Sequence, residues 1–424
     1  MPYLTTEMSP PPPPLAHELL IAQLAVQRAA LVTKRVLATL NLRPPGLLQR
    51  ASTEPISRFL HPDECSSPTS PTITTATTPP NGPLGHPHPG LERRLSLAKP
   101  DTSPVTVADF AAQALLVAAV HHAFPADRIV GEEDADALRS DPDLVAQVWE
   151  LVSTTRLDDA ESEARLGRPG SPEEMMELIA LGGASRCGRR RRFWCMDPID
   201  GTSAFLKGGQ YAISLALLED GRELLGVLGC PNLAPAMRGK VAERVVDRHG
   251  MGLMLAAVKG QGATWRPMGH GALREATRVD RGMGKPFDLR EIHLVDSSRS
   301  PATLTEKVRD LAAITGAVYP AQTELYSSHM RYAAMALGGR EFVQLRWPKP
   351  GKGPWSIWDH AGSQLIYTES GAGRVTDLAG NPIDFTTGKK LSKSWGLITA
   401  DESIHGKILA LVDSMLAADA NVNP

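Results

Sequence analysis

The chain has 424 residues, of which 42% are apolar and 22% charged, and its formal net charge is −2. A chain of this length and apolar content can bury a large core, in one large domain or in two smaller ones. The near-neutral charge excludes a chain-wide basic field of the kind that nucleic-acid binding requires, so we expect no nucleic-acid partner.

The cysteines and the apolar runs bear on the compartment. The four cysteines show no CxxC spacing, and Cys195 and Cys230 lie in apolar runs typical of strands, which favours reduced, buried thiols. No apolar run approaches the length of a membrane span, and the start of the chain lacks the order of a secretory signal. We therefore expect a cytoplasmic protein with no membrane partner and, by default, a monomer.

The first hundred residues alternate between proline-rich and helical patterns. Residues 1–16 form a proline-rich tail, and apolar residues from position 17 to about 39 recur near helical spacing, which predicts one amphipathic helix. Residues 41–95 are dominated by Pro, Ser, Thr, Gly and His. Burial of so few apolar residues cannot offset the conformational entropy lost when the segment becomes ordered. We therefore predict that it is a disordered insertion.

Acidic residues occur in two segments before the middle of the chain. Residues 103–123 predict an extended entry followed by a helix, and Asp109 near the helix start could simply cap it. Residues 128–134 predict a short strand that ends in Glu132 and Glu133. Acids after a strand are usually solvated, so neither position alone identifies a site.

Residues 192–202 combine a strand, a sharp turn and a helix start. Pro198 and Gly201 enforce the turn, and Thr202 can open a helix whose free N–H groups favour an anion such as phosphate. Asp197 and Asp200 flank the turn, where two hard oxygen ligands suit Mg²⁺. The combination suggests metal-assisted attack on a phosphate ester; the alternative is an ordinary Asx turn that caps a helix.

The remaining segments of the chain are predicted to form helices and strands that mainly support the site. Its expected elements are helices near 143–151 and 172–181, a hairpin of strands 211–218 and 223–228, a strand pair within 255–265, a strand at 292–299, a helix over 302–315, a strand near Val318, a helix over 328–337, a strand at 342–346, a helix from 355 to 371 with Asp359 in its first turn, strands at 374–376 and 396–400, and a helix over 403–417.

The Asp-Pro-Ile-Asp-Gly-Thr run at 197–202 resembles the signature of the lithium-sensitive, Mg-dependent phosphatase superfamily that includes inositol monophosphatase and fructose bisphosphatase. The superfamily also has an upstream Glu-Glu and a downstream Trp-Asp, present here at 132–133 and 358–359. Residues 103–113 and 192–212 are similar to segments of the 3'(2'),5'-bisphosphate nucleotidases, the branch that removes the 3'-phosphate of adenosine 3',5'-bisphosphate.

This resemblance implies an α/β (α+β) fold, a five-layered αβαβα sandwich of the sugar phosphatase type. An N-terminal α+β part, residues 17–290, would bind the metal, and a C-terminal α/β part, residues 291–424, would close over the nucleotide. The site is expected at their junction.

The resemblance also implies roles for individual residues. Two or three Mg²⁺ ions would be held by Glu132, Asp197, the Ile199 carbonyl, Asp200 and Asp359, and lithium or sodium would inhibit by occupying one of these positions. Asp109 and Thr202 would align or deprotonate the attacking water. The amides near Gly201 and Thr202 would neutralise the phosphoryl oxygens, and Asp359 would also help to fix the substrate.

In the relatives the second half supplies the nucleotide pocket, to which the resemblance assigns Arg299, Ser328, Arg331 and Arg346. Each cation alone is more often a surface charge, but three that converge on a second phosphate would suit a bisphosphate. Arg299 stands where relatives often have histidine, and Ser203 where they commonly have lysine.

The sequence thus predicts a Mg-dependent hydrolase that converts adenosine 3',5'-bisphosphate to AMP and phosphate, with 3'-phosphoadenylyl sulfate as a further substrate. Two alternatives stay open. One is an inositol phosphate phosphatase that uses the same metals, and the other is an inactive phosphate-binding or interaction protein whose important part is the insertion at 41–95.

Overall fold

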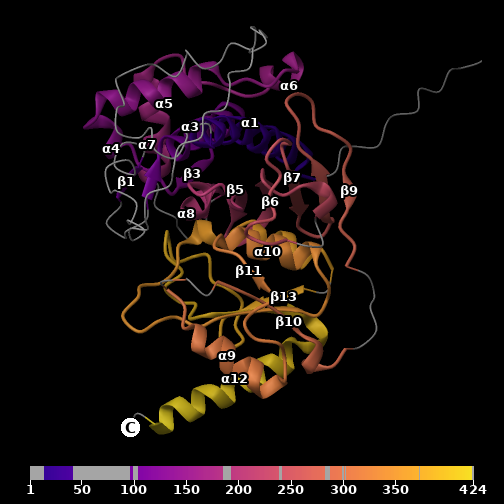
Figure 1. Cartoon of the computed structure of the whole chain (residues 1–424). Coiled ribbons are helices and arrows are strands. Elements are labelled where there is room, and N and C mark those ends of the chain that lie inside the picture. Colours follow the sequence, from indigo (N-terminus) through magenta and orange to yellow (C-terminus); the bar gives the residue numbers. More distant parts are fainter. Residues whose placement is uncertain are drawn as a thin grey trace, which may run out of the picture.

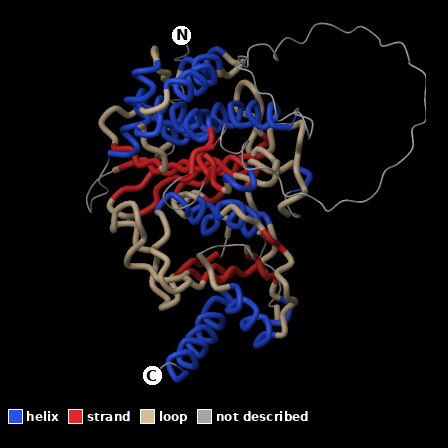
Figure 2. The backbone as a smooth tube through the Cα atoms, turned by 60° about the vertical axis from the view of Figure 1, so that its left-hand side comes forward, coloured by secondary structure: helices blue, strands red, loops and turns tan. Residues whose placement is uncertain are grey.

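The computed structural model describes residues 14–41, 96–98, 104–184, 192–237, 241–281, 287–297, 300, 302–371 and 373–422. Helices and two large sheets stack in five layers, in the order helix, sheet, helix, sheet, helix (Figures 1 and 2). This stacking confirms the predicted αβαβα sandwich. Residues 1–13 and 42–95, which hold nearly all of the predicted tail and insertion, lie outside the described residues; Ala16 and Asn41 are helical.

The larger sheet pairs its strands in sequence order, with the first pair parallel and the later pairs antiparallel. Its strands are β3 (Arg128–Gly131), β4 (Phe193–Asp200), β5 (Ala212–Glu219), β6 (Arg222–Cys230), β7 (Leu253–Val258), β8 (Gly262–Pro267) and β9 (Thr277–Arg278). The central strands are buried on both faces, so their side chains alternate between two cores. In β4, Trp194 and Met196 pack into one core and Phe193 and Cys195 into the other.

Helices cover both faces of this sheet. The outer face is covered by α1 (Ala16–Asn41) and α3 (Val107–Ala123), with α4 (Asp136–Arg139), α5 (Pro142–Thr154), α6 (Ala160–Ala164) and α7 (Pro172–Ala184) around them. The inner face is covered by α10 (Ser328–Leu337) and α11 (Ser363–Glu369), which therefore lie between the two sheets. A small separate pair, β1 (Ser96–Ala98) and β2 (Pro104–Thr106), leads into α3.

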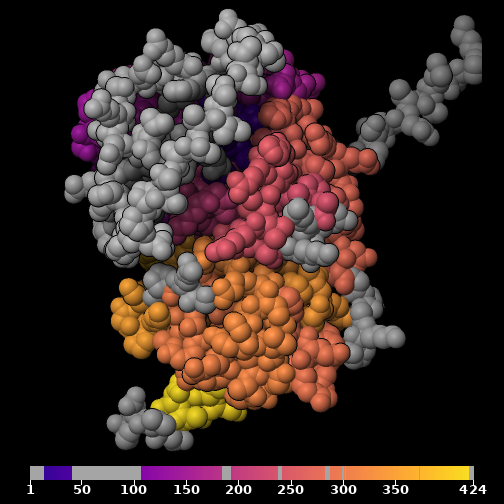
Figure 3. Space-filling view, viewed as in Figure 1, coloured from indigo at the N-terminus to yellow at the C-terminus, as the bar shows by residue number. Residues whose placement is uncertain are grey.

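The smaller sheet has the strand order β11 (Thr323–Glu324), β10 (His293–Asp296), β12 (Phe342–Arg346), β14 (Leu397–Asp401) and β13 (Gly373–Thr376). Its outer face is covered by α9 (Thr305–Thr315) and α12 (Glu402–Val422). In the space-filling view, the residues coloured orange to yellow form one end of the molecule, and α12 projects there (Figure 3). The single-turn helix α8 (Thr202–Phe205) and three short 3-10 turns, η2 (Pro235–Met237), η3 (Leu289–Glu291) and η4 (Ile357–Asp359), complete the described elements.

Several predicted elements have the observed bounds or nearly so, among them α10, β12 and the β5–β6 hairpin. Three predictions were wrong. The turn predicted at Pro198 begins only at Gly201, because β4 continues to Asp200 with a bulge. No strand forms at Val318, which lies in a loop and is 61% exposed; Pro320 just beyond it lacks the N–H that a strand ladder needs, and pairing begins only at Thr323. The helix predicted from 355 to 371 is interrupted because Gly362 adopts a positive φ of 84°. Asp359 therefore ends the 3-10 turn η4, and α11 starts only afterwards.

Candidate active site

Two of the predicted metal ligands lie on neighbouring parallel strands, Glu132 directly after β3 and Asp197 within β4. Gly131 of β3 pairs with Met196 of β4, so Glu132 and Asp197 come one residue later at the same edge of the sheet. Asp197 is buried, and Glu132 is half-buried. The Gln113 side chain of α3 holds the next residue, because it accepts from the Glu133 N–H at 2.9 Å and donates to the Glu133 carbonyl at 2.7 Å.

A bulge in β4 brings Asp200 to the side of Asp197. Asp197 pairs with Ser214 and Asp200 with Ala212, so three steps along β4 match two steps along β5. Residues three apart in a regular strand point to opposite faces, and the extra residue of a bulge reverses this. Carboxylate oxygens of Asp197, Asp200 and Asp359 accordingly lie within 4.8 Å of one another.

The turn after β4 requires glycine at one position. Gly201 has a φ of 89°, and a Cβ there would lie 2.9 Å from the Cβ of Ser327. Thr202 then opens α8 (Thr202–Phe205), which is a single turn. The Thr202 hydroxyl donates to the Ile199 carbonyl at 3.1 Å. The residues predicted to hold phosphate therefore sit in a tight turn rather than at the end of a long helix.

Asp200 is anchored at the start of α10. Its Oδ2 accepts from the Ser327 hydroxyl and from the His329 N–H, both at 2.6 Å, and Ser327 also caps the helix. The positive end of the helix dipole favours a carboxylate there. Burial nevertheless raises the pKa of Asp200 against these hydrogen bonds. Because both bonds use Oδ2, Oδ1 is left for a cation.

Asp359 reaches the cluster from the 3-10 turn η4, which contacts β4. Its carboxylate accepts from the Ser356 N–H at 3.3 Å. The following turn is pressed against β6, since a Cβ on Gly226 would lie 2.3 Å from the Gly362 carbonyl oxygen. Burial raises the pKa of Asp359 to about 6, and the negative charges of Asp200 and Glu132 add to the rise. The acids therefore repel one another, as carboxylates gathered around a cation site do.

The predicted catalytic pair lies on α3 and α8, and α3 packs against β4. Asp109 is buried in the first turn of α3, and Thr202 opens α8. Strand β2 contacts both helices, which brings these two turns into one neighbourhood. Asp109 is 1% exposed, so it is not a solvated surface acid.

Two predicted substrate-binding arginines are buried together. Arg331 is 3% exposed and Arg346 6%, and both donate to the Ser328 hydroxyl, at 3.0 and 3.3 Å. The guanidinium of Arg346 also lies 4.2 Å from the centre of the Trp355 ring. Within the described part of the chain, neither arginine forms an ion pair with a carboxylate. Burial lowers the pKa of Arg331 to about 10. These are not surface charges; Arg299, the third predicted cation, lies outside the described residues.

Three residues near the site were missed in the sequence. His329 lies between the named Ser328 and Arg331, His360 bonds Tyr332 at 3.0 Å, and Lys389 donates to the Gly182 and Gly183 carbonyls at 3.2 and 3.0 Å. His360 could have been found within the Trp-Asp-His-Ala-Gly run. The partners of His329 and Lys389 are distant in the chain, so no local pattern indicates them.

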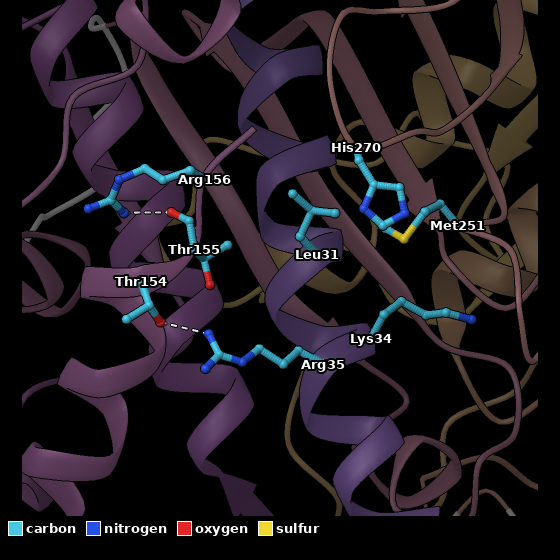
Figure 4. Close-up of a pocket in the computed structure, with 8 residues that line it drawn as sticks. All are labelled: Leu31, Lys34, Arg35, Thr154, Thr155, Arg156, Met251 and His270. Atoms are coloured by element: carbon cyan, nitrogen blue, oxygen red, sulfur yellow. Dashed lines mark hydrogen bonds between the residues drawn. The ribbon is translucent and has the colours of Figure 1, made fainter. Parts of the chain in front are cut away.

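A cavity of about 310 Å³ lies away from these acids, between α1 and the segment after α5 (Figure 4). Its basic side chains are already engaged. The Lys34 ammonium donates to three oxygens, of Pro231, Asn232 and Asp247, and Arg156 donates to carbonyls at the end of α5. Because α1 covers the outer face of the sheet, this cavity is separate from the acid cluster.

None of the helices in the described ranges combines the length and the apolarity that crossing a bilayer would require.

Known proteins are similar to this chain over most of its length. A family model described as the inositol monophosphatase family matches residues 88–417. A 3'(2'),5'-bisphosphate nucleotidase of Emericella nidulans is 36% identical over 325 residues, which cover 76% of this chain and 91% of the relative. One from Oryza sativa is 32% identical over 332 residues, covering 75% and 86%. An inositol monophosphatase structure from Anabaena is 16% identical, with a TM-score of 0.49 and coverage of 94% and 96%. The chain belongs to the inositol monophosphatase family, in which it is similar to proteins named 3'(2'),5'-bisphosphate nucleotidase.

Proposed function

We propose that this protein is a 3'(2'),5'-bisphosphate nucleotidase that removes the 3'-phosphate of adenosine 3',5'-bisphosphate to give AMP and phosphate. The names of its fungal and plant relatives support this activity. The observation that carries the proposal is a pair of buried guanidiniums next to the acid cluster. The charge of Asp359 acts on Arg346, and that of Asp200 acts on Arg331. A substrate with two phosphates can place one at the acids and the other at the arginines.

The acid cluster suits Mg²⁺, because its donors are all oxygens and Mg²⁺ prefers carboxylate ligands. We assign Glu132, Asp197, the Ile199 carbonyl and Asp200 from the N-terminal part, and Asp359 from the C-terminal part, as ligands of two or three ions. When bound, Mg²⁺ would lower the pKa of a water molecule and stabilise charge on the leaving oxygen.

The protein's own groups orient the reaction. Asp109 accepts a proton from the attacking water, and the Thr202 oxygen accepts a second hydrogen bond from the same water while its hydroxyl donates to the Ile199 carbonyl. The amides of Gly201 and Thr202 donate to the phosphoryl oxygens, on which negative charge gathers in the transition state. Ser328, Arg331 and Arg346 bind the second phosphate, and Asp359 helps to fix the substrate.

The test compares substrates at fixed Mg²⁺. Phosphate release is measured from adenosine 3',5'-bisphosphate, 3'-phosphoadenylyl sulfate, inositol monophosphates and AMP, which lacks a 3'-phosphate. We expect the two 3'-phosphorylated nucleotides to react with the highest kcat/KM and AMP not to react. A preference for inositol monophosphates would reject the proposal, and so would the absence of Mg-dependent turnover.

A further inference from the structure

His329 is fully buried in the first turn of α10 and forms hydrogen bonds in three directions. Its backbone N–H donates to Asp200 Oδ2 at 2.6 Å. Its ring Nε2 lies 2.7 Å from the Trp358 carbonyl oxygen, and its Nδ1 lies 2.7 Å from the Ser363 hydroxyl. One residue thus connects the turn that carries Asp200 with the turn that carries Asp359.

The partners of the ring define its tautomer. A carbonyl oxygen only accepts, so Nε2 carries the proton and donates to Trp358. Nδ1 is then an acceptor for the Ser363 hydroxyl at 2.7 Å, which is nearer than the His360 carbonyl oxygen, the other acceptor for the same proton, at 3.2 Å. The imidazole is therefore held from both sides, and its orientation is specified by its neighbours rather than by space filling alone.

The turn at Asp359 depends on such external support. It is a single 3-10 turn, Ile357–Asp359, and residues 350–354 before it are exposed. Trp358 immediately precedes Asp359, so a bond to the Trp358 carbonyl restrains the backbone to which the carboxylate is attached. On the other side, the ammonium groups of Lys389 and Lys390 lie 5.8 Å from the centre of the Trp358 ring.

We propose that His329 is a positioning residue that sets the separation of the Asp200 and Asp359 carboxylates, through its backbone N–H on one side and its ring N–H on the other. Residues that orient metal ligands without touching the metal change affinity because they decide how well the ligands converge. The inference rests on the proposed Mg²⁺ site, to which His329 contributes no ligand atom.

The test measures binding of Mg²⁺ alone to the full chain by calorimetry, together with the thermal midpoint of each variant without metal. His329→Ala should weaken Mg²⁺ binding on the order of tenfold. His329→Gln should stay within about threefold of the parent chain, because the glutamine amide can still donate to the Trp358 carbonyl.

His405 provides a matched control. It is also a buried histidine, its Nε2 bonds the Thr376 hydroxyl at 3.0 Å, and burial lowers its pKa to about 4, as burial does for His329. It lies in α12, beyond the smaller sheet. His405→Ala should lower the thermal midpoint but leave Mg²⁺ affinity unchanged. Three results would overturn the proposal. His329→Ala could leave Mg²⁺ affinity unchanged, or His405→Ala could lose as much affinity as His329→Ala. The third is that His329→Gln binds Mg²⁺ as weakly as His329→Ala.

The variant Asp359→Asn distinguishes a failure of the proposed Mg²⁺ site from a failure of the role proposed for His329. If that variant binds Mg²⁺ like the parent chain, the metal site itself is wrong; if it binds more weakly while His329→Ala does not, only the role of His329 is wrong. Ser363→Ala removes just the hydroxyl that orients the ring, and it applies the same test should His329→Ala not fold. Unchanged Mg²⁺ affinity in that variant would then overturn the proposal.

Discussion

Arg331 and Arg346 donate to one and the same hydroxyl, that of Ser328, although they belong to a helix and to a strand of the smaller sheet. Two buried cations this close repel each other, and the positive charge of Arg346 contributes to lowering the pKa of Arg331, after burial. An anion placed between them would relieve that repulsion. The charges of Asp200, Asp296 and Asp359 offset part of the repulsion, and a bound anion would offset more of it.

Replacing one of these cations should affect only substrates that carry the second phosphate. Arg346→Gln is expected to raise KM for adenosine 3',5'-bisphosphate by about tenfold or more, since a charge-assisted bond contributes about 1.5–3 kcal/mol. With 3'-AMP, which lacks the 5'-phosphate, KM should hardly change. Steady-state kinetics with both substrates check this, and an equal loss on both would argue against a second phosphate seat.

We expect the carboxylates of the site to have two different roles, one as a general base and the others as metal ligands. Asp109→Asn is expected to lower kcat by about 10²- to 10⁴-fold, the usual contribution of a general base, with Mg²⁺ binding retained. Asp197→Asn should weaken Mg²⁺ binding as well as turnover, because it removes a charged ligand oxygen. Calorimetric titration alongside kinetics distinguishes the two, and loss of Mg²⁺ binding in Asp109→Asn would contradict its assignment as a base.

Mg²⁺ binding should weaken on acidification. Burial and the charges of Asp200 and Glu132 raise the pKa of Asp359 to about 6, so this carboxyl takes up a proton as the pH falls through that value. A cation must displace that proton, and the apparent affinity should fall by about tenfold per pH unit for each proton displaced. Titrations between pH 5 and 8 test this. An affinity that is constant over the range would mean that Asp359 is not a ligand.

A buried carboxyl outside the site should make the fold less stable in alkali. Glu223 accepts from the Gly362 N–H at 2.7 Å and from the Gln364 amide at 3.2 Å, and burial raises its pKa to about 7. The pKa of Glu223 is higher in the folded than in the unfolded chain. Its contribution to the free energy of unfolding is therefore fully present below the unfolded pKa and is lost as the pH rises through about 7.

Glu223→Gln cannot ionise and should therefore raise the free energy of unfolding at pH 8.5 by on the order of 2 kcal/mol, with little change at pH 5. Denaturant unfolding at the two pH values measures the difference. Glu219→Gln, at an exposed position of the neighbouring strand, should be neutral at both. A gain for Glu223→Gln that is the same at pH 5 and 8.5 would show that ionisation is not its cause.

The sequence by itself determined the elements and the acids that end them. The bounds of α10 and β12 follow from periodicity, and Glu132 and Asp200 lie at strand ends, as the residues beside them predicted. Such signals are readable because local backbone preference and side-chain alternation act over a few residues. The wrong strand at Val318 shows the limit, since a single apolar residue does not supply a pairing partner.

Only the tertiary structure decided which groups meet. The bulge that turns Asp200 toward Asp197 depends on the register of β4 against β5, and the bonds of His329 join segments that are far apart in the chain. Arg331 and Arg346 became a buried pair because α10 packs between two sheets. Register and layer packing come from long-range contacts summed over the whole core, and no local pattern in the chain encodes them.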